Sequence, residues 1–244
     1  MAIYPEKQYD EEVDPQEVRK YIVFKKRLNP KFWADDLSMK PKVRLLLLKV
    51  SMEFYNFIDL KDLYVEDIIV TGSNASYNYT SLSDLDVHLI VDFNKAPCPD
   101  LIENFFITKK TLWNTLHDIK VGGQNVEMYV QDKKGSLQAN GIYSILNNEW
   151  VMKPKAKKPS WDDNAVIAKT EFYANEVDVI LAASEIDDID DLLGRLKRMR
   201  QSGLASGGEF STENLAYKSL RNLGYLDKLF SARSKLQDRK LSGM

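Results

Sequence analysis

The stretch from Val70 to Phe93 constrains the fold more than any other part of the chain. An apolar run, Ile68 to Val70, ends in a Thr-Gly-Ser turn, and after a polar segment Asp84 and Asp86 open a second apolar run, Val87 to Val91. This spacing predicts two strands joined by a loop or a short helix. Since side chains alternate along a strand, the two aspartates should share one face while their apolar neighbours point into the packed side.

Two carboxylates on one strand face repel each other when both are ionised, so we expect positive charge between them. Divalent cations bound by carboxylate oxygens meet this need, and Mg²⁺ is the leading candidate because it also takes phosphate oxygens. The alternative is a strand end with two solvated acids. Acids are poor strand formers, however, and Asp84 and Asp86 lie within an apolar segment, which favours a metal site.

Gly72 and Ser73 lie just before this pair and suit an anion. Glycine lets the backbone turn tightly and approach a ligand closely. Ser73 offers a hydroxyl and a backbone N–H where a helix would begin, as a helix cap, a phosphate contact or both. We therefore expect the phosphates of a nucleotide here.

Together these residues resemble the signature of the DNA polymerase beta type nucleotidyltransferase superfamily. The resemblance is carried by Gly72-Ser73, by the spacing to Ser83-Asp84-Leu85-Asp86 and by the hydrophobic frame on both sides. It implies a mixed α/β (α+β) sheet with helices packed on it, and a nucleotide site that includes Ser83 with Gly72 and Ser73. It also implies a third carboxylate on a later strand.

The segment Val126 to Val130 fits that requirement, because Glu127 and Tyr129 share one face of the predicted strand. The resemblance then implies two Mg²⁺ ions, or Mn²⁺, held by Asp84, Asp86 and Glu127. The implied reaction transfers a nucleoside monophosphate from a nucleoside triphosphate, ATP by default, to an acceptor hydroxyl with release of pyrophosphate. We expect the three carboxylates to meet beside the turn at residues 72 and 73.

The acceptor stays open at this point. Many small members of the superfamily carry Arg-Gly where this chain has Ser76-Tyr77, so a basic contact to the substrate is missing or comes from elsewhere. The acceptor could be an RNA end, a small molecule or a protein side chain. Two other classes also fit the sequence: a nucleotide-sensing module that binds without turnover, and an interaction protein that uses its C-terminal helices.

Composition sets outer limits on these alternatives. The 244 residues are 44% hydrophobic and 29% charged, as in an ordinary globular protein, and the net charge of −2 argues against attraction of nucleic acid to the whole surface. The single Cys98 excludes an intramolecular disulfide and favours a reducing compartment. The polar N-terminus and the short aliphatic runs predict a cytoplasmic protein without a membrane span.

The hydrophobic pattern predicts two parts joined by a linker. Residues 1–152 read as the nucleotidyltransferase-like domain with an N-terminal helical extension, residues 153–159 as a proline- and lysine-rich linker, and residues 160–244 as a helical domain. Predicted helices cover residues 15–26, 41–57, 101–119, 162–183, 188–204 and 212–240, and a further extended segment covers residues 141–146.

Two smaller features complete the reading. His88 shares the aspartate face, and we interpret it as a buried, hydrogen-bonded histidine rather than a metal ligand. The segments Gly207–Ser211 and Arg221–Asp227 resemble the C-terminal region of uncharacterised nucleotidyltransferase-like proteins of tailed bacteriophages, which indicates a phage origin and, with it, the cytoplasm of a host cell.

Overall fold

The structure is a computed structural model that describes residues 13–60, 63–96, 98–135, 139–156, 159–183 and 185–243. Packing divides the chain into two units. One, the sheet unit, is Val23–Lys158, and the other, the helical unit, combines Met1–Ile22 with Pro159–Met244. The sequence predicted residues 1–152 as the first domain; of these, the described residues 13–22 group with the C-terminal helices.

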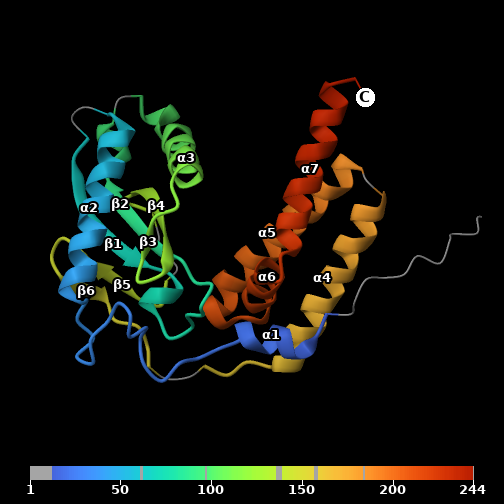
Figure 1. Ribbon diagram of the computed structural model, residues 1–244, viewed down its shortest axis with the longest axis horizontal. Coiled ribbons are helices and arrows are strands. Elements are labelled where there is room, and N and C mark those ends of the chain that lie inside the picture. The colour runs from blue at the N-terminus through green and yellow to red at the C-terminus, as the bar shows by residue number, and fades with distance from the viewer. Residues whose placement is uncertain are drawn as a thin grey trace, which may run out of the picture. The chain divides into compact units, whose positions relative to one another are not determined.

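A mixed six-stranded sheet forms the centre of the sheet unit (Figure 1). Its spatial order is β3-β4-β2-β1-β5-β6, in which β1 and β2 are antiparallel while β2 and β4 are parallel. The bounds are β1 Val65–Thr71, β2 Leu85–Val91, β3 Lys120–Val121, β4 Gln124–Asp132, β5 Ile142–Ser144 and β6 Glu149–Met152. The predicted α/β class is therefore confirmed. Of the extended segment predicted over residues 141–146, Ile142–Ser144 form a strand, β5, whereas β6 was not predicted.

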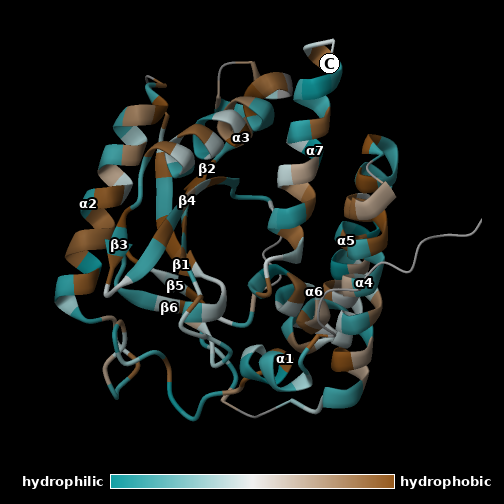
Figure 2. Cartoon of the chain, turned by 45° about the vertical axis from the view of Figure 1, so that its right-hand side comes forward, coloured by the Kyte–Doolittle hydropathy of each residue, from teal (hydrophilic) through white to brown (hydrophobic). Residues whose placement is uncertain are grey.

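Two long helices contribute to the core on the apolar face of this sheet. They are α2 (Pro41–Ile58) and α3 (Pro99–Leu116), and each begins with a proline at its first helical residue, where no backbone donor is lost. In Figure 2 hydrophobic and hydrophilic segments alternate around α2, as expected of a helix with one buried side. The shared core includes Leu47, Phe54, Val87, Leu89, Phe106, Trp113 and Met128.

The alternation of β2 sends every second side chain to this core and places Asp86 and His88 on the opposite face. Leu85, Val87, Leu89 and Val91 are buried, while the residues between them are half-buried. Gly122 and Gly123, both at positive φ, form the turn from β3 into β4. This turn pairs β3 with one edge of β4, and the other edge of β4 pairs with β2.

The helical unit contains α1 (Pro15–Tyr21), α4 (Asp163–Ala183), α5 (Ile186–Gly207), α6 (Thr212–Asn222) and α7 (Tyr225–Leu241). Val18 and Ile22 belong to the same buried cluster as apolar residues of α4 to α7, which explains why the N-terminal segment groups with this unit. The single helix predicted over residues 212–240 is wrong: it breaks at Gly224, which has a φ of 82° and follows the end of α6. Glycine adopts this left-handed conformation at little cost.

The remaining helix predictions differ mainly at their ends. The short helix predicted over residues 15–26 ends at Tyr21, and short 3-10 turns follow Gly72, Asp92 and Gly207. The predicted linker, 153–159, includes Lys157 and Lys158, which lie outside the described residues. Among the helices the structure describes, none combines the length and apolarity needed to cross a bilayer.

The core of α2 provides a stability test. Leu47 is fully buried and Leu45, on the same helix, is 69% exposed. We expect Leu47→Ala to lower the free energy of unfolding by about 2–5 kcal/mol, because it removes buried methyl groups and leaves a cavity. The matched Leu45→Ala variant should change it by less than about 0.5 kcal/mol. Urea unfolding followed by circular dichroism measures both, and equal losses would contradict the burial of this face.

Candidate functional site

The register of β2 and β4 brings two of the predicted carboxylates to one face. Asp86 on β2 and Glu127 on β4 are directly paired in the parallel ladder. Directly paired residues on neighbouring strands project from the same side of a sheet. Both side chains are half-buried and lie opposite to the packed core. The glutamate is therefore on the side of the sheet that the proposed metal site requires.

Gly72 lies against Asp86 from the other side. Thr71, the last residue of β1, pairs with Asp86, and a Cβ built on Gly72 would lie 2.0 Å from Asp86 Oδ2. Gly72 also has a φ of 75° and a ψ of −160°, a region that only glycine occupies readily. Backbone conformation and close approach both require glycine at this position, so the carboxylate of Asp86 is packed directly on the Gly-Ser turn.

Tyr129 interacts with all three predicted carboxylates, Asp84, Asp86 and Glu127. Its hydroxyl donates a hydrogen bond to Glu127 Oε2. Burial raises the pKa of the Tyr129 phenol well above its usual value, and the negative charges of Asp86, Glu127 and Asp84 raise it further. All three carboxylates thus act on one phenol, which stays protonated and serves as a donor at neutral pH.

Asp84 and Ser83 are held by a buried amide network that the sequence did not indicate. Asn74 Nδ2 donates to the backbone carbonyl oxygens of Ser83, at 3.1 Å, and of Asp84, at 2.8 Å. Asn29 Nδ2 donates in turn to Asn74 Oδ1 and to Gln124 Oε1, at 2.9 and 2.8 Å. Because these amides are buried and satisfied by one another, they fix the segment that leads into β2.

The two serines take different places in this turn. Ser73 begins the 3-10 turn Ser73–Ala75 and is half-buried. Ser83 is 7% exposed and its hydroxyl accepts a hydrogen bond from the Thr80 backbone N–H at 2.9 Å. Of the two, Ser73 is the more accessible for a phosphate, while Ser83 closes a local turn.

The donor chemistry of this face fits Mg²⁺, because Asp86 and Glu127 present oxygen ligands side by side on one face. Within the described ranges, however, no group of three or more histidine, cysteine, aspartate or glutamate side chains is arranged to hold a metal ion. One oxygen of Glu127 accepts the Tyr129 hydrogen bond instead. A carboxylate has two oxygens with two lone pairs each, so this bond leaves Glu127 able to bind a cation at the same time.

Tyr129 lies between a histidine and a lysine. The His88 ring stacks on the Tyr129 ring with centroids 4.6 Å apart, and Lys110 Nζ lies 4.1 Å from the centroid of the same ring. His88 Nδ1 lies 2.8 Å from Gln131 Oε1, so the predicted hydrogen-bonded histidine is confirmed. Burial lowers the pKa of His88 to about 4, and the Lys110 charge contributes, so His88 is neutral at pH 7.

Sequence reasoning placed Tyr129 on the correct face but did not recognise its hydrogen bond to Glu127. The sequence feature that could have indicated this bond is the spacing of two residues between Tyr129 and Glu127, which puts both side chains on one strand face. The sequence did not indicate Asn74, Asn29 or Lys110, because their contacts join segments far apart in the chain.

Ser76 and Tyr77, where this chain departs from the pattern that it otherwise resembles, are both buried. The Tyr77 ring stacks on the Phe24 ring with centroids 5.4 Å apart. Neither residue is therefore available to replace the basic contact.

Comparisons with known proteins add little to this geometry. No family model matches the chain, and no curated protein matches it. Among solved structures, the chain is similar to a STING-associated CdnE c-di-GMP synthase from Capnocytophaga granulosa, at 12% sequence identity and a TM-score of 0.23, covering 82% of this chain and 84% of the other.

The contact of Gly72 with Asp86 can be tested against a matched glycine. Gly208 has nearly the same backbone angles, φ 69° and ψ −156°, but a Cβ there would meet nothing within 4 Å. Gly208→Ala should lower the free energy of unfolding only by the backbone strain, of order 1–3 kcal/mol. Gly72→Ala should cost about 1–3 kcal/mol more, because its methyl group displaces the Asp86 carboxylate. Urea unfolding of both variants measures the difference, and equal costs would contradict this contact.

The neutral state of His88 gives a pH prediction. Its pKa falls from 6.5 to about 4 on folding, so the unfolded chain binds the proton more tightly. The resulting stability is fully present above pH 6.5 and is lost as the pH falls toward 4, by about 3 kcal/mol at most. Unfolding free energies measured between pH 7 and 4 should therefore fall less steeply for His88→Gln than for the original chain. Parallel curves would show that His88 is not held neutral.

Proposed function

We propose that this chain is a nucleotidyltransferase that transfers a nucleoside monophosphate from a nucleoside triphosphate, by default ATP, to an acceptor hydroxyl. Two Mg²⁺ ions, or Mn²⁺, would be held by Asp84, Asp86 and Glu127. When bound, these ions would neutralise phosphate charge and lower the pKa of the acceptor hydroxyl.

The observation that carries this proposal is the pairing of Asp86 with Glu127 on the polar face, with Gly72 packed against Asp86. Alternating strand residues could have put the glutamate on the core side, and a shift of one residue in register would have done so. The Gly-Ser turn then lies at one side of Asp86 and the glutamate at the other. This order supports a phosphate site beside β1 and an acceptor site beside β4.

The chain's own groups have distinct roles in this proposal. Gly72 leaves room for the Asp86 carboxylate beside the turn, and the half-buried Ser73 binds phosphate oxygens of the nucleotide. Ser83 stabilises the turn that presents Asp84. Tyr129 is a positioning residue: its hydroxyl orients the carboxylate of Glu127 before the substrates bind.

A second candidate function is a nucleotide sensor that binds without turnover. The hydrogen bond from Tyr129 to Glu127 is compatible with it, because a binding module can use Glu127 as a hydrogen-bond acceptor with no catalytic role. Incubation with α-labelled nucleoside triphosphates and Mg²⁺ or Mn²⁺, with and without host RNA, distinguishes the two. Release of pyrophosphate supports the transferase, whereas tight binding without release supports the sensor.

Removal of a single carboxylate should separate chemistry from folding. Asp86→Asn and Glu127→Gln should each lower the rate of pyrophosphate release by about 10³-fold or more, because charge neutralisation at the reacting phosphate is lost. Asp86→Asn should leave the free energy of unfolding unchanged or slightly higher, since it relieves repulsion between like charges.

The matched control is Asp118→Asn. The Asp118 side chain is 73% exposed and pairs only with Lys120 among the salt bridges of the described residues. Replacement of Asp118 should leave the rate of pyrophosphate release within about twofold of the rate of the unsubstituted chain. An Asp86→Asn variant with near-normal turnover would reject this assignment.

A further inference from the structure

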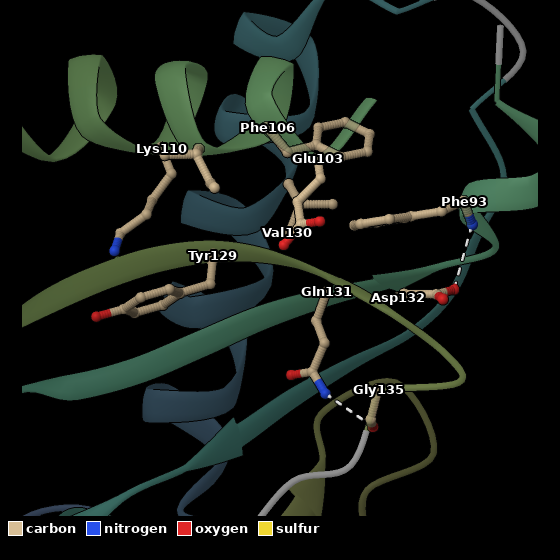
Figure 3. A pocket seen from close by; sticks show the side chains of 10 residues that line it. Phe93, Glu103, Phe106, Lys110, Tyr129, Val130, Gln131, Asp132 and Gly135 are labelled. Carbon is tan, nitrogen blue, oxygen red and sulfur yellow. Dashed lines mark hydrogen bonds between the residues drawn. The ribbon is translucent and has the colours of Figure 1, made fainter. Parts of the chain in front are cut away.

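A cavity of about 450 Å³ lies between β4 and α3, within the sheet unit. Figure 3 shows its walls: Phe106 and Lys110 come from α3, Phe93 lies to one side, and Tyr129 and Gln131 project from β4. The Phe93 and Phe106 ring centroids are 5.2 Å apart. Ile107, also from α3, is 52% exposed at the lining. A pocket of this size with aromatic walls suits a ligand with an apolar, flat body.

The cavity adjoins the edge of β4 that does not pair with β2. Along a strand the N–H and C=O of one residue point to the same side, and successive residues alternate. Asn114 bonds both the N–H and the C=O of Met128, at 3.0 and 3.2 Å, and the Asp132 carbonyl accepts the Gly135 N–H at 2.9 Å. Val130 lies between these two residues. Its N–H and C=O therefore point to the same side, toward the cavity that Val130 lines.

The charged and polar side chains around the cavity disfavour an anionic ligand. Glu103 and Asp132 are acidic, and Asp132 Oδ1 accepts the Phe93 N–H at 3.3 Å. Lys110 is the cation of the lining, and its ammonium lies over the Tyr129 ring. The Gln131 amide bonds His88 and the Gly135 carbonyl. An uncharged flat ring that offers a donor and an acceptor to the Val130 backbone matches these groups.

The position of the cavity relates it to the proposed reaction. In the sheet, β1 with its Gly-Ser turn lies on one side of β2, and β4 lies on the other. The cavity adjoins β4 and therefore lies away from the phosphate side. The ring of Tyr129 forms part of its wall, while the Tyr129 hydroxyl contacts Glu127. Glu127 itself does not line the cavity, and Tyr129 connects the cavity to this carboxylate.

We infer that this cavity binds the planar heteroaromatic ring of a nucleoside-type acceptor, read by the backbone N–H and C=O of Val130. This inference rests on the proposed function, because it assigns the acceptor of the same reaction. It selects a small molecule or nucleotide that carries a base over an acceptor protein side chain.

Binding of nucleosides without phosphates tests the cavity separately from the metal site. Equilibrium dialysis of the full chain in EDTA with labelled adenosine, guanosine, cytidine or uridine should detect binding of at least one of them. Ile107→Trp, which fills the cavity from an exposed helix position, should weaken that binding at least tenfold. The matched Leu112→Trp variant changes another exposed residue of α3 outside the cavity, 47% exposed, and should bind as the original does. Asp86→Asn should also bind normally.

The transfer assay then separates the two proposals. With the bound nucleoside as acceptor, Ile107→Trp should raise the KM for that nucleoside at least tenfold and leave the KM for the triphosphate unchanged. Transfer by a chain that binds no nucleoside, or whose binding is unaffected by Ile107→Trp, overturns the cavity assignment and leaves the proposed function standing. An increase in the KM for the triphosphate alone also overturns it. Nucleoside binding sensitive to Ile107→Trp, without transfer to any acceptor, overturns the proposed function while the cavity remains a ring-binding site.

Discussion

The parallel pairing of β2 with β4 is the interaction on which the candidate site depends. It sets Asp86 directly beside Glu127, and it leaves the other edge of β4 facing α3. A shift of one residue would turn Glu127 into the core and Met128 out of it, at the cost of burying a carboxylate and exposing an apolar side chain. The packing of the core therefore enforces the positions of the polar residues on the opposite face.

The close approach of Gly72 to Asp86 also fixes the position of the Asp86 carboxylate. Strand pairing fixes the distance between backbones, and the missing side chain at residue 72 gives the carboxylate its place. The amide network of Asn29, Asn74 and Gln124 then holds the segment between the two strands. Since its members are buried and bonded to one another, this polar cluster makes the turn rigid without any ligand.

Much of this arrangement could be predicted from the sequence, because strand periodicity is a local property. The alternation of Asp86 with Val87, and of Glu127 with Met128, indicated which side chains would point away from the core. Local patterns could not predict that α1 packs in the helical unit, since that depends on contacts of Val18 with distant helices. They also missed the break at Gly224, where one glycine interrupts an otherwise helical pattern. The hydrogen bond between Tyr129 and Glu127 depends on side-chain conformations that spacing does not specify.

We propose that Asp86 and Glu127 act together on a metal-bound nucleotide. The most direct measurement is a double-mutant cycle on pyrophosphate release with Asp86→Asn, Glu127→Gln and the double variant, in Mg²⁺. If the two carboxylates form one site, each single variant should lose nearly all activity and the double variant should lose little more. Independent, additive losses, or turnover that survives both substitutions, would contradict this account.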